Sequence, residues 1–286
     1  MENMSNKDSA DLSLKAADDF ATYIRQIEPD KRQKGEIWST AIGLQQVDNL
    51  TPSAYLYQTA KRNVEGELTL PEANHLINDY YQTKKQQHAA VGRQEEADKV
   101  ASRIALILSE QTFNFSPAYL SSIHRQLFGD IYSFAGQWRD YNISKQEWIL
   151  NGASVIYAPA FELQAALAYD FDQERVFSYE GLDINDIITH VSGFIAKIWQ
   201  IHPFGEGNTR TVAVFSIKYW RKLGFELDNE PFAQHSWYFR NALVRANYSN
   251  LCLGVKENHE YLERFWQNVI LGEKNDLSNQ ELKIDG

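Results

Sequence analysis

The segment "IHPFGEGNTR", from Ile201 to Arg210, lies between two long apolar stretches. Before it, "DINDIITHVSGFIAKIWQI" repeats apolar residues at helical spacing, and one face of that helix would carry Ile187, Val191, Phe194, Ile195 and Ile198. After it, "NTRTVAVFSIKYWRKLG" is apolar almost all round; its β-branched run would also suit a buried strand, but its length favours a helix. The sequence therefore predicts two buried helices joined by a short polar loop.

The loop itself has the composition of an anion site. Pro203, Gly205 and Gly207 stop the first helix, and the glycines let the backbone approach a ligand closely. Asn208 or Thr209 is expected to cap the second helix. Because the first N–H groups of a helix lack intrahelical partners and its N-terminus carries a positive partial charge, the loop predicts a site for phosphate.

Three ionisable residues in the same segment indicate a reaction. His202 can remove a proton from an attacking hydroxyl, and Glu206 offers a hard oxygen ligand for Mg²⁺ shared with phosphate oxygens. Arg210 follows one helical turn later, where it would contact a second phosphate or pair with Glu206. The other six histidines are expected to be helix caps or satisfied surface groups. This combination suits transfer of a phosphorus group from a nucleotide.

Composition narrows the class of protein. The chain has 286 residues, 43% of them apolar, and 28 Lys and Arg against 38 Asp and Glu give a net charge of −10. This charge favours neither nucleic acid nor an anionic membrane as a partner. One cysteine, Cys252, excludes an internal disulfide and a cysteine zinc site. With no signal peptide and no membrane-spanning run, a cytoplasmic protein is expected; an effector exported without a cleaved signal is the alternative.

Most of the remaining chain has helical spacing. Helix starts are expected at Thr51, followed by Pro52, at Ser116, followed by Pro117, and at Thr69. One region differs: "WRDYNISKQEWILNGASVIYAP" alternates imperfectly and contains Asn151-Gly152, a strong hairpin signal. It predicts a small two-stranded flap near residues 139–159 that lies against the helices. Its aromatic residues are expected to be packing groups rather than substrate contacts: Trp138, Tyr141, Trp148 and Tyr157.

The loop closely resembles the signature of the Fic family. "HPFGEGNTR" resembles its motif, "LFGDIYSFAGQWRDYNISK" resembles the segment that leads into its flap, and "YFRNALVRANYSN" resembles a later helix. Together these stretches cover roughly residues 95–270. In this family the commonest activity is transfer of AMP from ATP to a protein Ser, Thr or Tyr hydroxyl.

The resemblance assigns roles to single residues. It implies that His202 is the base, that Glu206 holds Mg²⁺, and that Arg210 contacts phosphate. Gly205, Gly207, Asn208 and Thr209 would then belong to the nucleotide site, with Gly207 and Asn208 in the anion hole. Phe204 would anchor the loop, and the flap would pair with an extended segment of the target protein. Self-modification is a further expectation, because many family members modify themselves.

Two departures from the family pattern concern the nucleotide. Thr209 stands where the family often has glycine. Ala213 stands where adenylylating members usually carry a second arginine, which contacts the γ-phosphate. Loss of that contact would weaken nucleotide affinity by about 1.5–3 kcal/mol and leaves the choice of nucleotide open.

The N-terminal part resembles the small helical antitoxin module of Fic systems. Its inhibitory motif has a hydroxyl residue, a glutamate and then glycine or asparagine; Leu44, Asp48 and Asn49 occupy these positions here. Since the glutamate's usual partner has become Ala213, both ends of the inhibitory ion pair are altered together. We expect that Asp48 and Asn49 no longer inhibit through that pair. The alternative is that these helices only support the structure.

The sequence thus predicts a mainly α Fic fold with a β-hairpin flap over the active site. The expected parts are an N-terminal helical extension at 1–90, a Fic core at 91–272 and a polar C-terminal tail at 273–286. The expected reaction is Mg²⁺-dependent AMP transfer from ATP to a protein. The alternatives are transfer of another phosphorus-linked group and a catalytically silent binding or regulatory module. The oligomeric state is left open.

Overall fold

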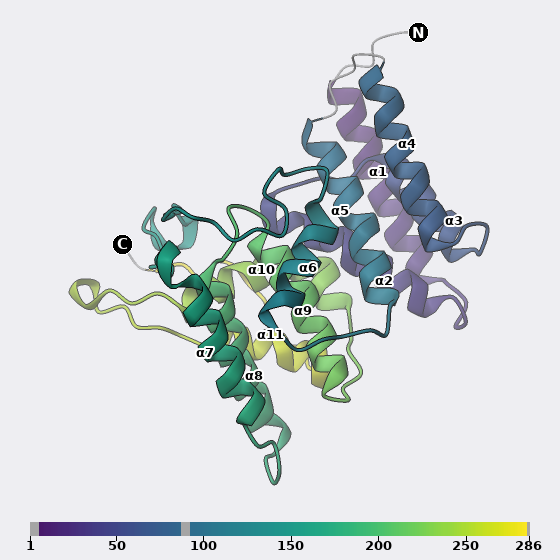
Figure 1. Ribbon diagram of the computed structural model, residues 1–286. Helices are drawn as coiled ribbons and strands as arrows, with labels where there is room; N and C mark the ends of the chain where they lie inside the picture. The colour runs from purple at the N-terminus through teal and green to yellow at the C-terminus, as the bar shows by residue number, and fades with distance from the viewer. Residues whose placement is uncertain (1–5, 87–91, 285–286) are drawn as a thin grey trace. The chain divides into compact units, whose positions relative to one another are not determined.

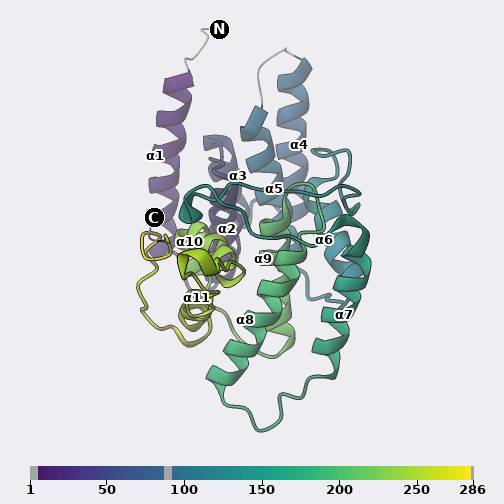
Figure 2. The ribbon, with the colours of Figure 1, turned by 90° about the vertical axis from the view of Figure 1, so that its left-hand side faces the viewer.

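The computed structural model describes residues 6–86 and 92–284 and is helical, as predicted (Figures 1 and 2). The chain divides into two compact units. The first contains the described residues up to Gln111 and residues 232–234, and the second contains residues 112–231 and 235–284. Among the described residues, no helix is both long and apolar enough to cross a membrane.

The first unit is a bundle of five helices and one short 3₁₀ turn. Helix α2 packs on α5, α5 packs on α4, and α3 contacts both α1 and α4. The elements are α1 (Asn6–Arg25), α2 (Arg32–Gly43), η1 (Leu44–Asp48), α3 (Ala54–Val64), α4 (Leu70–Gln86) and α5 (Gly92–Ser109).

Helix starts in both units test the predicted caps. The predicted cap at Ser116 is confirmed, because its hydroxyl accepts from the Tyr119 N–H at 3.2 Å. Thr69 is confirmed as well, since its hydroxyl accepts from the N–H of Glu72, whose carboxylate accepts from the Thr69 N–H at 2.7 Å. The predicted cap at Thr51 is wrong, because α3 begins two residues later and is capped by Ser53.

The second unit holds the predicted helix pair. Helix α9 (Asn208–Lys222) is buried at every position from Asn208 to Trp220, and it packs against α6 (Pro117–Phe128) and α8 (Ile184–Ile201). Helix α8 also contacts α7 (Leu163–Val176) and α11 (Glu260–Leu271). The remaining elements are η2 (Trp148–Leu150), η3 (Ala160–Glu162), α10 (Glu230–Ala246), which bends at His235, and η4 (Leu251–Leu253).

The flap, residues 139–159, forms no β-strand, so the predicted hairpin is corrected. Asn151 and Gly152 do adopt the positive φ angles that the hairpin signal requires, 52° and 88°. Next to the turn the arms do bond to each other, because the Glu147 N–H donates to the Ala153 carbonyl at 2.9 Å. Further out they bond to side chains: the Ser154 hydroxyl accepts from the Lys145 N–H, and Arg139 donates to the Tyr141 and Ala158 carbonyls. The backbone pairing therefore stops at the turn and does not continue into a cross-strand ladder.

Beyond α11, the C-terminal segment packs against the flap. The Ile284 N–H donates to the Ile149 carbonyl at 2.9 Å, and Leu277, Leu282 and Ile284 are buried. The aromatic residues of the flap and Trp138, just before it, divide into two kinds. Tyr157 is buried and Trp138 donates to the Ser121 hydroxyl, whereas Tyr141 and Trp148 are exposed.

Candidate active site

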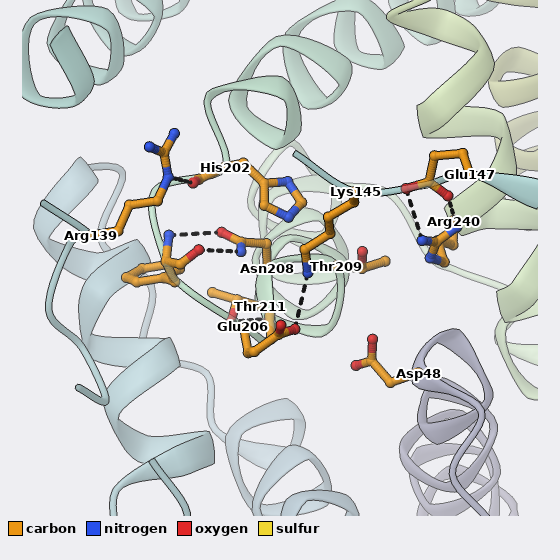
Figure 3. Close-up of polar contacts among 12 residues, drawn as sticks. Asp48, Arg139, Lys145, Glu147, His202, Glu206, Asn208, Thr209, Thr211 and Arg240 are labelled. Atoms are coloured by element: carbon orange, nitrogen blue, oxygen red, sulfur yellow. Dashed lines mark hydrogen bonds and ion pairs between the residues drawn. The ribbon is translucent and has the colours of Figure 1, made fainter. Parts of the chain in front are cut away.

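Helix α8 ends at His202, which adopts a left-handed backbone conformation with φ 52° and ψ 58°. A residue with a side chain is strained there by about 1–2 kcal/mol, so its neighbours must hold it. The His202 N–H donates to the Trp199 carbonyl at 3.1 Å, and the Arg139 Nε donates to the His202 carbonyl at 2.8 Å (Figure 3). The turn thus fixes the position of the histidine that the sequence singled out.

The imidazole of His202 is held in one tautomer. Its Nδ1 lies 3.1 Å from the Trp199 carbonyl oxygen. Because a carbonyl oxygen only accepts hydrogen bonds, Nδ1 carries the proton and Nε2 keeps its lone pair. Burial, together with the positive charge of Lys145, lowers the pKa of His202 well below its ordinary value. The side chain is therefore a neutral imidazole at pH 7, the form that a proton acceptor needs.

Arg139 connects the flap to this turn, a role that sequence reasoning missed. Its guanidinium donates to four backbone carbonyls, those of Tyr141 and Ala158 in the flap and of Ile201 and His202 at the end of α8. Its own N–H donates to the Pro203 carbonyl at 2.8 Å. Arg139 is 5% exposed. Burial lowers its pKa, yet an arginine remains charged at neutral pH.

Asn208 closes the loop rather than capping α9. Its side-chain oxygen accepts from the Phe204 N–H at 3.0 Å, and its side-chain nitrogen donates to the Phe204 carbonyl at 2.8 Å. The cap residue of α9 is Gly207, which has no side chain to accept from the first N–H groups of the helix. The predicted cap at Asn208 or Thr209 is therefore wrong. The Thr209 hydroxyl instead accepts from the Trp199 indole N–H at 3.0 Å.

Gly207 is required by a neighbouring aromatic ring, and Gly205 lies close to the end of a tyrosine side chain. A Cβ at Gly207 would lie 2.5 Å from carbons of the Phe128 ring, and its φ of 76° already disfavours a side chain. A Cβ at Gly205 would lie 2.6 Å from the Tyr141 hydroxyl. The sequence suggested that these glycines admit a ligand; the contacts indicate that they admit Phe128 and Tyr141.

His124 supports the loop from α6 and was also missed. Its Nδ1 accepts from the Gly136 N–H at 2.8 Å, so its Nε2 carries the proton and donates to the Glu206 carbonyl at 2.9 Å. Its ring stacks on Phe204 with a centroid separation of 3.8 Å, and Phe204 is 1% exposed. Burial lowers the pKa of His124 to about 4. The loop thus rests on a neutral histidine.

Glu206 points its carboxylate outward from the loop. The side chain is 55% exposed, and its Oε2 lies 3.0 Å from the Lys145 Nζ (Figure 3). In the described parts of the chain, no group of three or more His, Cys, Asp and Glu residues could hold a metal ion. A single carboxylate fits Mg²⁺ only when phosphate oxygens and water supply the other ligands. The residues present fit that arrangement.

The start of α9 is the remaining part of the candidate site. Helix α9 has no side-chain cap, a feature it shares with α2, α7, α10 and α11, but it is the one that follows the glycine loop. Its first N–H groups therefore suit an external acceptor. Arg210, in the first turn, is 1% exposed, and its guanidinium carbon lies 4.8 Å from the centre of the Phe128 ring. Its contact with phosphate stays a prediction.

The two predicted regulatory residues lie in the first unit. Asp48 ends η1, and Asn49 follows with a left-handed backbone at φ 53°. The Arg93 guanidinium donates to the Asp48 carbonyl. In the second unit, Ala213 is fully buried in α9 and offers no cation.

Comparison with known proteins gives the class to which this site belongs. Residues 114–219, which include α8, the flap and the loop, match the Fic/DOC family. The chain carries a Fic/DOC family domain, as the motif predicted.

Two curated relatives are named as adenylyltransferases. One is the protein adenylyltransferase VbhT of Bartonella schoenbuchensis, 29% identical over 143 residues that span 47% of this chain and 28% of that protein. The other is the probable protein adenylyltransferase y4lH of Sinorhizobium fredii, 34% identical over 129 residues, 45% of this chain and 64% of that protein. The chain thus spans less than two thirds of either relative.

Solved structures with a similar fold include Fic proteins of Bartonella. An N-terminal Fic domain from Bartonella quintana with bound ADP is 18% identical, with a TM-score of 0.49 over 64% of this chain and 87% of that one. The BepC protein of Bartonella tribocorum with bound AMPPNP is 20% identical, with a TM-score of 0.46 over 59% of this chain and 81% of that one.

Proposed function

We propose that this domain transfers AMP from ATP to a hydroxyl group of a protein side chain. The observation that carries the proposal is the fixed tautomer of His202, which keeps Nε2 as a proton acceptor in the loop before α9. Both curated relatives are named as adenylyltransferases, and they support the same chemistry.

The reaction needs one proton transfer and one displacement at phosphorus. His202 Nε2 accepts the proton of the attacking hydroxyl, and the hydroxyl oxygen forms a bond to the α-phosphorus of ATP. The bond from that phosphorus to the oxygen bridging to the β-phosphate breaks, and pyrophosphate leaves. The N–H groups that begin α9, with Arg210, would stabilise the phosphate charge.

Glu206 is the residue that would hold Mg²⁺. A bound Mg²⁺ would neutralise phosphate charge and fix the orientation of the leaving pyrophosphate. The carboxylate is exposed, which agrees with a ligand that meets a metal arriving on the nucleotide.

The flap is the surface that would meet the target protein. Tyr141, Trp148 and Ile156 are 53%, 44% and 84% exposed, and such apolar groups suit contact with an extended peptide. A second copy of the chain is one target, which would produce self-modification. We propose that the first unit descends from an inhibitory module, with Asp48 and Asn49 as its altered motif.

Transfer of another phosphorus-linked group is the second candidate. The observation that favours it is Ala213, a buried uncharged residue where a cation for the last phosphate is expected. A binding module without turnover is the third candidate, against which His202, Glu206 and Asn208 argue.

Intact-protein mass spectrometry tests the proposal. The purified chain is incubated with Mg²⁺ and with ATP, GTP, CTP or UTP, alongside the variant His202→Ala. An AMP adduct on the wild type alone supports the proposal, and an adduct of another nucleotide or of phosphate supports the second candidate. If no adduct forms, calorimetric titration with ATP distinguishes an enzyme that requires its own target from a domain that no longer binds the nucleotide.

A further inference from the structure

A flap lysine already occupies the carboxylate that is proposed to hold the metal. Lys145 Nζ lies 3.0 Å from the Oε2 of Glu206, and the two side chains are 29% and 55% exposed (Figure 3). The two residues are 61 positions apart in the chain, so the pair connects the flap to the loop between α8 and α9. A cation approaching Glu206 therefore meets a carboxylate that is already paired.

The backbone around Lys145 is anchored independently of this pair. The Lys145 N–H donates to the Ser154 hydroxyl at 3.1 Å. Two residues further on, the Glu147 carboxylate accepts two bonds from Arg240 of α10, at 2.7 and 3.0 Å, and the Glu147 side chain is 2% exposed. Lys145 can therefore leave Glu206 by rotation of its own long side chain, while the flap stays anchored at Glu147.

Simple electrostatics makes the two cations competitors. An ammonium group and a divalent cation repel each other, and Mg²⁺ approaches a carboxylate oxygen to about 2.1 Å, where Lys145 Nζ would be in its way. An exposed ion pair contributes only about 0.2–1 kcal/mol. A divalent cation can therefore displace the lysine, but it binds more weakly than it would to a vacant carboxylate.

We propose that Lys145 is a stand-in cation, which holds the Glu206 carboxylate until a divalent cation displaces it. This inference rests on the proposed role of Glu206 as the metal ligand. Removal of Lys145 should therefore strengthen metal binding, whereas loss of an ordinary flap residue would weaken it or leave it unchanged. The magnitude follows from the ion pair: about 1.4- to fivefold in the dissociation constant.

A double-mutant cycle with Mn²⁺ tests the proposal. Free Mn²⁺ is measured by electron paramagnetic resonance during titration of the full chain in the presence of α,β-methylene-ATP, which supplies phosphate oxygens but cannot transfer AMP, for the wild type, Lys145→Met, Glu206→Gln and the double variant. Lys256→Met is the matched control, because it removes the same charge from an exposed lysine in the loop after η4. We expect tighter binding for Lys145→Met alone, and no effect of Lys145→Met in the Glu206→Gln background.

Three results would overturn the proposal. Lys145→Met could behave as Lys256→Met does, its effect could persist without Glu206, or Mn²⁺ could bind without any dependence on Glu206. Because the readout needs neither turnover nor a target protein, it is separate from AMP transfer. If AMP transfer occurs but the effect of Lys145→Met does not depend on Glu206, Lys145 is not the stand-in cation and the proposed function stands. If the effect depends on Glu206 but no AMP is transferred, the role of Lys145 stands and the proposed function does not.

Discussion

The Nδ1 atom of His202 lies 3.1 Å from the carbonyl oxygen of Trp199, one turn earlier in the chain. This bond directs Nε2 away from the helix end, and the left-handed backbone of His202 is what brings the ring back toward α8. A general base and its orienting group are thus supplied by one helix terminus, with no carboxylate needed to fix the tautomer.

The pH dependence of the proposed reaction should reflect this environment. Because burial and Lys145 lower the pKa of His202, the imidazole stays neutral as the pH falls through its ordinary value of 6.5. We expect kcat/KM for self-modification to lose no activity to protonation of the base as the pH falls through 6.5. A pH–rate profile of the free enzyme measures this. An acidic limb with its midpoint at 6.5 or higher would contradict the assignment.

Replacement of the base should separate chemistry from binding. His202→Ala removes the proton acceptor, and loss of general-base help typically lowers the rate by about 10²–10⁴-fold. The side chain forms no bond to the start of α9, so ATP affinity should stay nearly unchanged. Turnover measured by mass spectrometry and affinity measured by calorimetry test both halves. An equal loss of affinity would indicate misfolding instead.

Arg139→Lys should destabilise the second unit. An ammonium group cannot reach the four carbonyls that the guanidinium reaches, so buried acceptors lose their partners and the free energy of unfolding should fall by about 2–4 kcal/mol. Urea unfolding followed by tryptophan fluorescence reports on this unit, because six of the seven tryptophans lie in it.

Arg264→Lys is the control for that measurement. Arg264 is 39% exposed in its side chain and pairs with Glu281 at the surface, so the same substitution there should cost less than about 1 kcal/mol. Equal losses in the two variants would show that the carbonyl contacts of Arg139 do not matter for stability.

The loop motif could be predicted because its signals are local. Apolar spacing defined both helices, and the two glycines with Pro203 defined the break between them. Local signals failed where two candidates lay close together. Ser53 rather than Thr51 caps α3 because the Ser53 hydroxyl also bonds to Asp98, a residue 45 positions away that no local pattern indicates.

The supports of the site could not be predicted for the same reason. Arg139 bonds to a carbonyl 63 residues away, and His124 bonds to one 82 residues away. In the flap, the local prediction was correct for the turn and wrong for the strands. Asn151-Gly152 correctly indicated positive φ angles, but the strands were lost because Arg139 and Ser154 bond to the backbone groups of the two arms.

Asp48→Ala should leave the proposed activity nearly unchanged. The inhibitory pair of Fic systems needs a carboxylate and an arginine, and position 213 holds a buried alanine. Because that arginine is absent, loss of the Asp48 carboxylate should change self-modification by less than about threefold. The rate of adduct formation for the wild type and the variant, measured side by side, tests this. A rise of about tenfold, worth about 1.4 kcal/mol in the barrier, would show that Asp48 inhibits by another contact.

Gly207→Ala should cost more stability than backbone strain alone explains. The new Cβ would lie 2.5 Å from the Phe128 ring and would adopt a φ of 76°. Gly254→Ala is the matched control, because Gly254 has a φ of 67° and nothing within 4 Å of the new Cβ. We expect about 1 kcal/mol for Gly254→Ala and about 2–4 kcal/mol for Gly207→Ala, from urea unfolding.

The difference between these two variants measures the collision with Phe128. If the collision is real, the double variant Gly207→Ala with Phe128→Leu should lose less free energy of unfolding than the two single variants together. The reason is that the new methyl group fills part of the space that the ring vacates. Additive losses would mean that the loop moves away from Phe128 instead, and that the glycine at this position is required only for its backbone conformation.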